Sequence, residues 1–242
     1  MTANETVWLV VPTYDEAENI EPLIRAALER LPTGSRALVV DDASPDGTGR
    51  IADRLAAELG TVEVLHRDRK QGIGPAYVAG FERALAGGAG LVAQMDADLS
   101  HDPADLPRLL EATATADLVL GSRYAPGGSV ERWGPLRRAI SRGGSAYARA
   151  ILGVPVRDLT GGFKVFRRAV LEAIDIGSIA SLGYAFQVET TYRAIVAGFR
   201  VVEVPIRFED RRAGASKMSG RIVAEAALRI PEIRISRPRR RR

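Results

Sequence analysis

Short apolar runs alternate with amphipathic stretches along the first half of the chain. The run at 7–11 has no polar break and predicts a buried β-strand, and the runs at 37–40, 62–65, 91–95 and 118–120 predict further strands. Between them, apolar side chains recur at helical spacing, which predicts helices at residues 20–31, 51–59, 75–86 and 103–114. Strands and helices that alternate in this way are typical of parallel βαβ units. We therefore predict an α/β fold in which helices cover both faces of a mostly parallel central sheet.

The second half of the chain has a less regular pattern. It predicts a helix at 136–152, a strand at 161–166, a helix at 186–197 and an alternating strand at 201–208. A last helix is expected at 218–230, where the apolar residues share one side: Ile222, Val223, Ala226, Ala227 and Ile230. This side would either lie in a membrane interface or pack on the domain. We therefore divide the chain into a domain at 1–217 and a C-terminal amphipathic helix with a polybasic tail at 218–242.

Composition narrows the chemistry of any site. The chain of 242 residues is long enough for one domain with a sizeable core. It has no cysteine and only two histidines, His66 and His101, which excludes disulfides, thiolate chemistry, Cys-ligated zinc and His-rich metal sites. A metal site would have to be built on carboxylates, and such a site should prefer Mg²⁺ or Mn²⁺.

Positive charge is concentrated at the C-terminal end. Residues 210–242 contain 11 Lys or Arg and 3 Asp or Glu, whereas the whole chain has a net charge of only +4. The polybasic end, Arg234, Arg237 and 239–242, would be either a solvated terminus or an attachment to an anionic membrane surface. We expect no nucleic-acid binding, because no aromatic residues are interspersed with these arginines. No window of 18 apolar residues and no secretory signal are present, so we expect a cytoplasmic protein that is peripheral at the inner face of the membrane.

Polar clusters follow four of the predicted strands. In an open parallel sheet, ligands bind outside the carboxyl ends of the strands, and these clusters would meet there. They are Pro12-Thr13-Tyr14-Asp15-Glu16, Asp41-Asp42-Ala43-Ser44, Asp96-Ala97-Asp98 and Gly121-Ser122-Arg123-Tyr124. Four clusters on one edge favour a functional site more strongly than any of them alone.

Asp96 and Asp98 have the most specific chemistry of these residues. Two carboxylates at this spacing repel each other unless a cation or a proton lies between them. Their hard oxygen ligands suit Mg²⁺ or Mn²⁺ bridging a diphosphate. The alternative is a pair of aspartates that only cap loops, as Asp102 before Pro103 could cap a helix. The buried run at 91–95 that precedes the pair favours the metal site.

Asp41 and Asp42 form the second carboxylate pair. An aspartate at the end of a strand in such a sheet often accepts hydrogen bonds from a ribose or a base. The alternative is a turn-forming role, which we assign instead to Asp46 and Gly47.

Several of these motifs resemble one enzyme family. The run from Val11 to Ile20 and the run from Val40 to Thr48 are similar to those of glycosyltransferase family 2, and Asp96-Ala97-Asp98-Leu99-Ser100-His101 resembles its metal motif. Three further motifs are similar to those of polyprenol (dolichol) phosphate mannose synthases: Gly121-Ser122-Arg123-Tyr124, Asp158-Leu159-Thr160-Gly161-Gly162-Phe163 and Gly214-Ala215-Ser216-Lys217. The resemblance runs from about Val7 to Lys217.

This resemblance implies a GT-A (Rossmann-like) αβα sandwich and a role for each matching residue. Pro12, Tyr14, Glu16 and Asp42 would hold the nucleoside of a nucleotide sugar. Asp96 and Asp98 would face the diphosphate and the metal, with Ser100 as a third ligand where the family often has Gln. Arg123, Arg137 and Ser141 would contact a lipid phosphate, and Arg211 and Lys217 would close over the diphosphate. Some relatives carry transmembrane segments after this point, so this chain would need peripheral docking or a membrane partner protein.

The implied reaction fits the charges of the second half of the chain. Transfer of mannose from GDP-mannose to a polyprenyl phosphate brings two anions together, which calls for arginine and lysine rather than a general base. The predicted helix at 136–152 carries four arginines, Arg137, Arg138, Arg142 and Arg149. A solvated charged face is the alternative interpretation of that helix.

Two other activities stay open. A glucosyl or other hexosyl donor, such as a UDP-sugar, would use the same chemistry. A metal-dependent nucleotidyltransferase would also use carboxylates and a nucleotide, but it would normally have a glycine-rich, basic loop after its first strand. Here that loop is the acidic run from Pro12 to Glu16.

Overall fold

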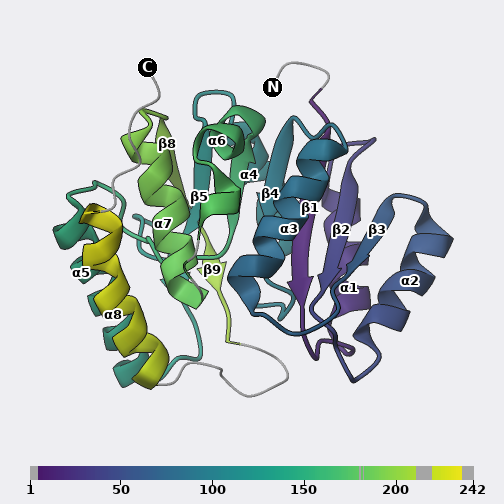
Figure 1. Ribbon diagram of the computed structural model, residues 1–242, viewed down its shortest axis with the longest axis horizontal. Coiled ribbons are helices and arrows are strands. Elements are labelled where there is room, and N and C mark those ends of the chain that lie inside the picture. Colours follow the sequence, from purple (N-terminus) through teal and green to yellow (C-terminus); the bar gives the residue numbers. More distant parts are fainter. Residues whose placement is uncertain (1–4, 180, 182, 211–219, 236–242) are drawn as a thin grey trace.

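A computed structural model describes residues 5–179, 181, 183–210 and 220–235. Arg211 and Lys217, as well as the tail at 236–242, lie outside the described residues. The prediction of a mostly parallel α/β fold is confirmed: helices cover both faces of a seven-stranded sheet (Figure 1). None of the helices in the described ranges is both long and apolar enough to cross a bilayer.

The first half of the chain forms the predicted elements, with small shifts at their ends. They are β1 (Val7–Thr13), α1 (Ile20–Arg30), β2 (Arg36–Asp41), α2 (Thr48–Leu59), β3 (Val62–His66), α3 (Ile73–Ala86), β4 (Leu91–Gln94) and α4 (Leu106–Ala112). A 3₁₀ turn at Pro103–Asp105 opens the segment expected to be one helix, and Asp102 caps it by accepting a hydrogen bond from the Ala104 amide.

The second half differs more from the prediction. Its elements are β5 (Leu118–Ser122), β6 (Ser129–Val130), α5 (Pro135–Leu152), β7 (Lys164–Arg167), α6 (Arg168–Ala173), α7 (Gly183–Val196), β8 (Val201–Pro205), β9 (Arg207–Phe208) and α8 (Gly220–Ile235). The single strand expected at 201–208 is two strands, because β8 pairs with β5 whereas β9 pairs with β6. The prolyl nitrogen of Pro205 has no hydrogen to donate, which favours the break at this position.

The strand order explains how distant segments reach one edge. The order is β3-β2-β1-β4-β7-β5-β8, and β7 runs antiparallel to both of its neighbours, β4 and β5. The start of β7 therefore lies at the edge where the parallel strands end. The loop at 158–163 reaches the site in this way, although it precedes a strand rather than following one.

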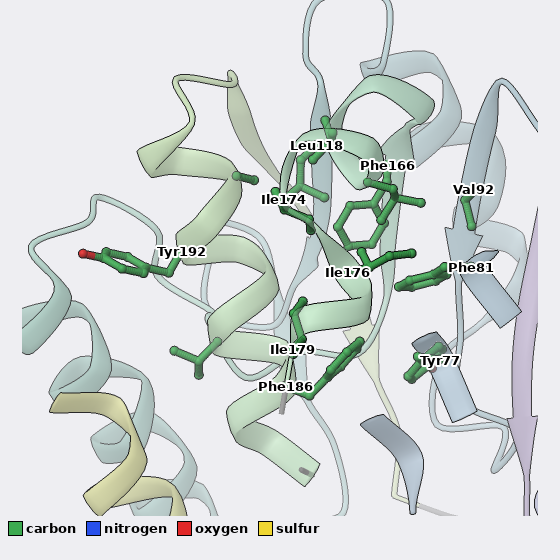
Figure 2. Close-up of a cluster of buried hydrophobic side chains, with 14 of the residues drawn as sticks. Tyr77, Phe81, Val92, Leu118, Phe166, Ile174, Ile176, Ile179, Phe186 and Tyr192 are labelled. Carbon is green, nitrogen blue, oxygen red and sulfur yellow. The ribbon is translucent and has the colours of Figure 1, made fainter. Parts of the chain in front are cut away.

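Two apolar layers hold the sheet in place. Helices α1, α2 and α4 pack on one face, while α3, α6 and α7 pack on the other, where Phe81, Phe166 and Phe186 cluster (Figure 2). Helix α8 packs against α5 and α7, and its Ile230 and Ile233 are buried in the same cluster. The predicted helix at 218–230 therefore extends to Ile235 and contacts the domain through Ile230 and Ile233, whereas the side chains of Ile222, Val223, Ala226 and Ala227 lie outside the described part of the chain.

Candidate active site

The loops after β1 and β2 are joined by hydrogen bonds. The amide of Glu16 donates to Thr48 Oγ1 at 3.0 Å, and the amide of Ala17 donates to Asp46 Oδ2 at 3.0 Å. Asp46 also accepts from the Thr48 amide two residues later, so its predicted turn-forming role is confirmed. These contacts set the positions of the first two polar clusters relative to each other.

Three residues other than glycine adopt left-handed backbone conformations at the strand ends. They are Asp15, Ala43 and Leu99, with φ of 56°, 62° and 58°, and they follow β1, β2 and β4. Such conformations are uncommon for residues with a Cβ and cluster at functional sites. The local backbone therefore marks the same edge as the polar side chains.

Asp42 orders the loop between β3 and α3. Its buried carboxylate accepts from Arg67 Nη1 at 2.6 Å and from the amides of Gln71 and Gly72 at 2.9 and 2.8 Å. The loop lines a pocket of about 430 Å³, formed by His66, Arg67, Asp68, Arg69 and Gln71. The Asp42 carboxylate is bonded to this loop, so Asp42 contributes to the site by fixing the position of the loop.

The other three residues expected to hold a nucleoside lie beside this loop or on β1. Pro12 is buried in β1, and Tyr14 and Glu16 are half-buried in the segment that follows it. The ammonium of Lys70 lies 3.4 Å from the centre of the Tyr14 ring. A lysine over an aromatic face forms a cation–π contact, so Tyr14 and Lys70 connect the loop after β1 to the loop after β3.

Asp96 and Asp98 follow β4 and are held by different neighbours. Tyr77 Oη donates to Asp96 Oδ1 at 2.8 Å, and burial together with the charge of Asp96 raises the pKa of Tyr77 well above its usual value. Ser100 donates to Asp98 Oδ1 through its hydroxyl at 2.5 Å and through its amide at 3.1 Å. Asp96 is half-buried and Asp98 is buried. The hydroxyl proton of Ser100 therefore points to Asp98 and orients its carboxylate.

The donor set fits a hard divalent cation that a substrate helps to bind. Among the described residues, no group of three or more His, Asp or Glu side chains could hold a metal ion. Mg²⁺ usually binds through only one or two carboxylates, with substrate phosphates and water completing its coordination. Asp96 and Asp98 match that arrangement.

A buried ion pair lies at the end of β5. Arg123 donates to Asp158 through Nε and Nη2, both at 2.7 Å, and through its amide at 2.9 Å; Nη2 also donates to Thr160. Burial opposes both charges, but the pair overcomes it, so the pKa of Asp158 is lowered and that of Arg123 is raised. Part of the positive charge expected for a lipid phosphate is therefore already compensated by Asp158.

Arg137 and Ser141 lie on α5, one turn apart. Arg137 Nη1 donates to both carboxylate oxygens of Asp210 at 2.8 and 2.9 Å, and its guanidinium lies 4.2 Å from the centre of the Trp133 ring. Its Nε is buried and has no hydrogen-bond partner in the described part of the chain. Ser141 Oγ accepts from the hydroxyl of Tyr124, which follows β5. These contacts bring α5 to the β5 end of the site.

Sequence reasoning did not assign roles to Tyr77, Asp158 or Lys70. Tyr77 fits the apolar period of its helix, so its hydroxyl gives no signal in the pattern. Asp158 lies within a motif of the family resemblance, and its pairing with Arg123 could have been proposed from that motif. Lys70 lies in the basic run His66-Arg67-Asp68-Arg69-Lys70, which could have been singled out by its charge.

Comparison with known proteins identifies the family. A family model described as Glycosyl transferase family 2 matches residues 8–175. The chain belongs to glycosyl transferase family 2. An undecaprenyl-phosphate mannosyltransferase from Micrococcus luteus is 50% identical to this chain over 224 residues, which cover 93% of this chain and 92% of that protein. A polyprenol monophosphomannose synthase from Mycolicibacterium smegmatis is 48% identical over 226 residues, covering 93% and 85%. The family resemblance predicted from the motifs is confirmed.

Solved structures confirm the GT-A fold of this glycosyl transferase family 2 member. Glucosyl-3-phosphoglycerate synthase from Mycobacterium tuberculosis, in complex with phosphoglyceric acid, has a TM-score of 0.70 at 18% identity, covering 96% of this chain and 80% of that one. Its complex with Mg²⁺ and uridine diphosphate has a TM-score of 0.68 at 18% identity, covering 97% and 80%. At this identity the likeness concerns the fold.

Proposed function

We propose that this protein is an inverting glycosyltransferase that transfers mannose from GDP-mannose to a polyprenyl (dolichyl-type) phosphate, giving a lipid-linked β-mannosyl phosphate. The observation that carries the proposal is the place of Asp96 and Asp98 on the sheet edge. They follow β4. In the sheet, β1 and β2 lie on one side of β4, and β7 and β5 lie on the other side. The names and high identity of the two curated relatives support the same sugar and acceptor.

The nucleoside of GDP-mannose would bind at the loops after β1, β2 and β3. Tyr14 and Glu16 are half-buried there, and Asp42 holds the loop that lines the neighbouring pocket. Pro12 supports this region from β1. Arg211 and Lys217 are proposed to contact the diphosphate, although both lie outside the described residues.

Asp96 and Asp98 would hold Mg²⁺ or Mn²⁺ together with the diphosphate. A bound divalent cation stabilises the negative charge that develops on a departing nucleoside diphosphate. Ser100 supports this role because its hydroxyl group orients the Asp98 carboxylate. We propose that the oxygen of the same hydroxyl group is a third ligand of the metal ion. Arginine and lysine side chains near the diphosphate would add to the same stabilisation.

The acceptor phosphate would bind at the β5 end of the edge, near Arg123, Arg137 and Ser141. Arg137 supports this placement, because its side chain is partly exposed and carries positive charge on the same helix as Ser141. A phosphate monoester has a second pKa near about 6, so it is mostly dianionic at pH 7 and needs no general base. Its oxygen attacks the anomeric carbon while the bond from that carbon to GDP breaks, and GDP leaves with the electron pair. A single displacement of this kind inverts the anomeric centre.

Helix α5 also supports contact with a membrane. Leu136 is 73% exposed, and Ile140 and Tyr147 are 39% exposed on the same side of the helix. The helix carries four arginines and no acidic residue. An apolar stripe next to basic side chains is typical of a helix that lies in the interface of an anionic bilayer. We propose that the protein is peripheral at the inner face of the membrane, where its lipid acceptor would be found.

A donor panel tests the proposed function. Purified protein is incubated with GDP-mannose, UDP-glucose or UDP-galactose, together with Mg²⁺ or Mn²⁺ and a short-chain polyprenyl phosphate, and the lipid product is identified by mass spectrometry. We expect a hexosyl product from GDP-mannose, with a β linkage by NMR. A product from a UDP-sugar alone would replace the donor that we propose. Release of pyrophosphate would indicate a nucleotidyltransferase instead.

The variant Asp98→Asn tests the metal site in the same assay. We expect turnover to fall by at least about a hundredfold while the thermal unfolding midpoint stays close to that of the wild type, because the change removes charge from the site and little volume. Asp102→Asn is a matched control, since Asp102 only caps a 3₁₀ turn. Unchanged turnover in Asp98→Asn would contradict the metal assignment.

A further inference from the structure

The hydroxyl group of Tyr77 reaches Asp96 from the interior of the protein. Tyr77 lies on α3 with no exposed surface. Its ring stacks on Phe186 at a centroid distance of 5.8 Å and an interplanar angle of 4°, and on Phe81 at 5.6 Å. Figure 2 shows the three rings in one cluster. These neighbours hold the ring, so its hydroxyl is placed 2.8 Å from Asp96 Oδ1.

The second oxygen of Asp96 lies close to the backbone of Gly162. A Cβ added at Gly162 would lie 2.8 Å from Asp96 Oδ2, which is closer than real Cβ atoms approach. A residue with a Cβ at this position would push the Asp96 carboxylate out of its place. Asp96 is therefore confined on two sides, by the Tyr77 hydroxyl at Oδ1 and by the Gly162 backbone at Oδ2.

Buried polar groups also lie behind Tyr77. Gln94 at the end of β4 is a neighbour of the Tyr77 hydroxyl, and its Nε2 donates to Gln187 Oε1 at 2.7 Å. The carbonyl of Gln187 accepts from Lys164 Nζ, also at 2.7 Å. All four side chains are buried. Gln94 Oε1 has no hydrogen-bond partner among the described residues, so this network is only partly satisfied, and the position of Tyr77 rests mainly on its stacked ring.

We propose that Tyr77 is a positioning residue, which orients the Asp96 carboxylate so that it can bind a divalent cation together with the nucleotide diphosphate. This inference rests on the metal site of the proposed function. A carboxylate ligand that is free to rotate must lose that freedom when the cation binds. Neighbours that hold a ligand in place are worth about 10- to 100-fold in metal affinity.

The variant Tyr77→Phe tests this role, because it keeps the stacked ring and removes only the hydroxyl. Binding of Mn²⁺ is measured by electron paramagnetic resonance in the presence of GDP, without acceptor and without turnover. We expect the Mn²⁺ dissociation constant to rise about tenfold or more. In the transfer assay we expect excess Mn²⁺ to restore kcat, which a loss of folding could not do. Tyr192→Phe is the matched control, since it removes a hydroxyl from a buried tyrosine of the same cluster.

A second variant approaches Asp96 from its other side. Gly162→Ala places a methyl group against Oδ2, and we expect it to weaken Mn²⁺ binding in the same way even if Tyr77→Phe is poorly folded. If wild type and both variants bind Mn²⁺ equally well, Tyr77 does not position Asp96, and the proposed function is unaffected. If the wild type binds no Mn²⁺ with either GDP or UDP, both the metal site and this inference are overturned.

Discussion

The ammonium group of Lys164, at the start of β7, lies against α7 with no solvent exposure. It donates to the carbonyl of Gln187 and, at 3.2 Å, to Thr190 Oγ1. Burial lowers the pKa of Lys164 from 10.5 to about 7, against the opposing charges of Asp158 and Asp96. The folded protein therefore loses this proton at a lower pH than the unfolded chain.

The variant Lys164→Met should change how the free energy of unfolding depends on pH. Between the two pKa values the unfolded chain holds more protons than the folded one, so this group makes the protein more stable as the pH rises from about 7 to about 10. Replacing a buried charge with an apolar side chain should stabilise the protein by about 1–4 kcal/mol near pH 6. The difference should shrink or reverse near pH 9.5. Urea unfolding at several pH values measures it, and a gap independent of pH would contradict the prediction.

Arg123 and Asp158 depend on each other for their place in the interior. Removing one partner of a buried ion pair leaves the other charge uncompensated, so Arg123→Ala should cost about 3–5 kcal/mol of stability. It should also raise KM for polyprenyl phosphate more than KM for GDP-mannose. Thermal unfolding and steady-state kinetics measure the two effects. Arg138→Ala, an exposed arginine on α5, is the control and should leave stability nearly unchanged. Equal changes in both KM values would argue against Arg123 as an acceptor contact.

At the scale of the elements, α5 has two distinct sides. Ser145, Ala148 and Leu152 are buried, whereas Leu136, Ile140 and Tyr147 are exposed on the opposite side. Helix α8 packs next to it (Figure 1) and exposes Leu228 and Ile235, by 74% and 83%. Exposed apolar side chains on neighbouring helices are consistent with an interface rather than a purely solvated face.

The double variant Leu136→Glu with Ile140→Glu tests α5 as the membrane contact. It removes apolar contact and adds two negative charges, so binding to vesicles of phosphatidylglycerol should weaken about tenfold or more. Co-sedimentation with the vesicles measures binding. Ala57→Glu, at an exposed position of α2, is the control for added charge. Unchanged binding of the double variant would exclude this side of α5 as the contact.

The sequence could not predict the direction in which β7 runs. A short buried run such as Lys164–Arg167 reads the same whether its neighbours are parallel or antiparallel. The position of the loop at 158–163 depends on that direction. Only the structure shows that this loop lies at the same sheet edge as the other polar clusters. Helix α6 was missed for a related reason, because its six residues are too few to display a helical period.

At the scale of the whole molecule, the first half of the chain was largely predictable. Each buried run there is followed by polar residues and then by a helical period, and this order places Asp42, Asp96 and Asp98 on one edge of a parallel sheet. What could not be predicted depends on contacts between distant segments. The pairing of Arg123 with Asp158 joins residues 35 positions apart, and the bond from Tyr77 to Asp96 comes from a residue that looks apolar in the pattern.

The central place of β7 has a mechanical consequence. Because β7 is hydrogen-bonded to β4 on one side and to β5 on the other, the strands before β4 in the sheet order and the strands after it form one continuous sheet. Within the described residues, a continuous sheet of this kind does not divide into two lobes that could swing together. If the proposed function is right, donor and acceptor bind along one rigid sheet edge, and the side chains on that edge set how well the two substrates are aligned.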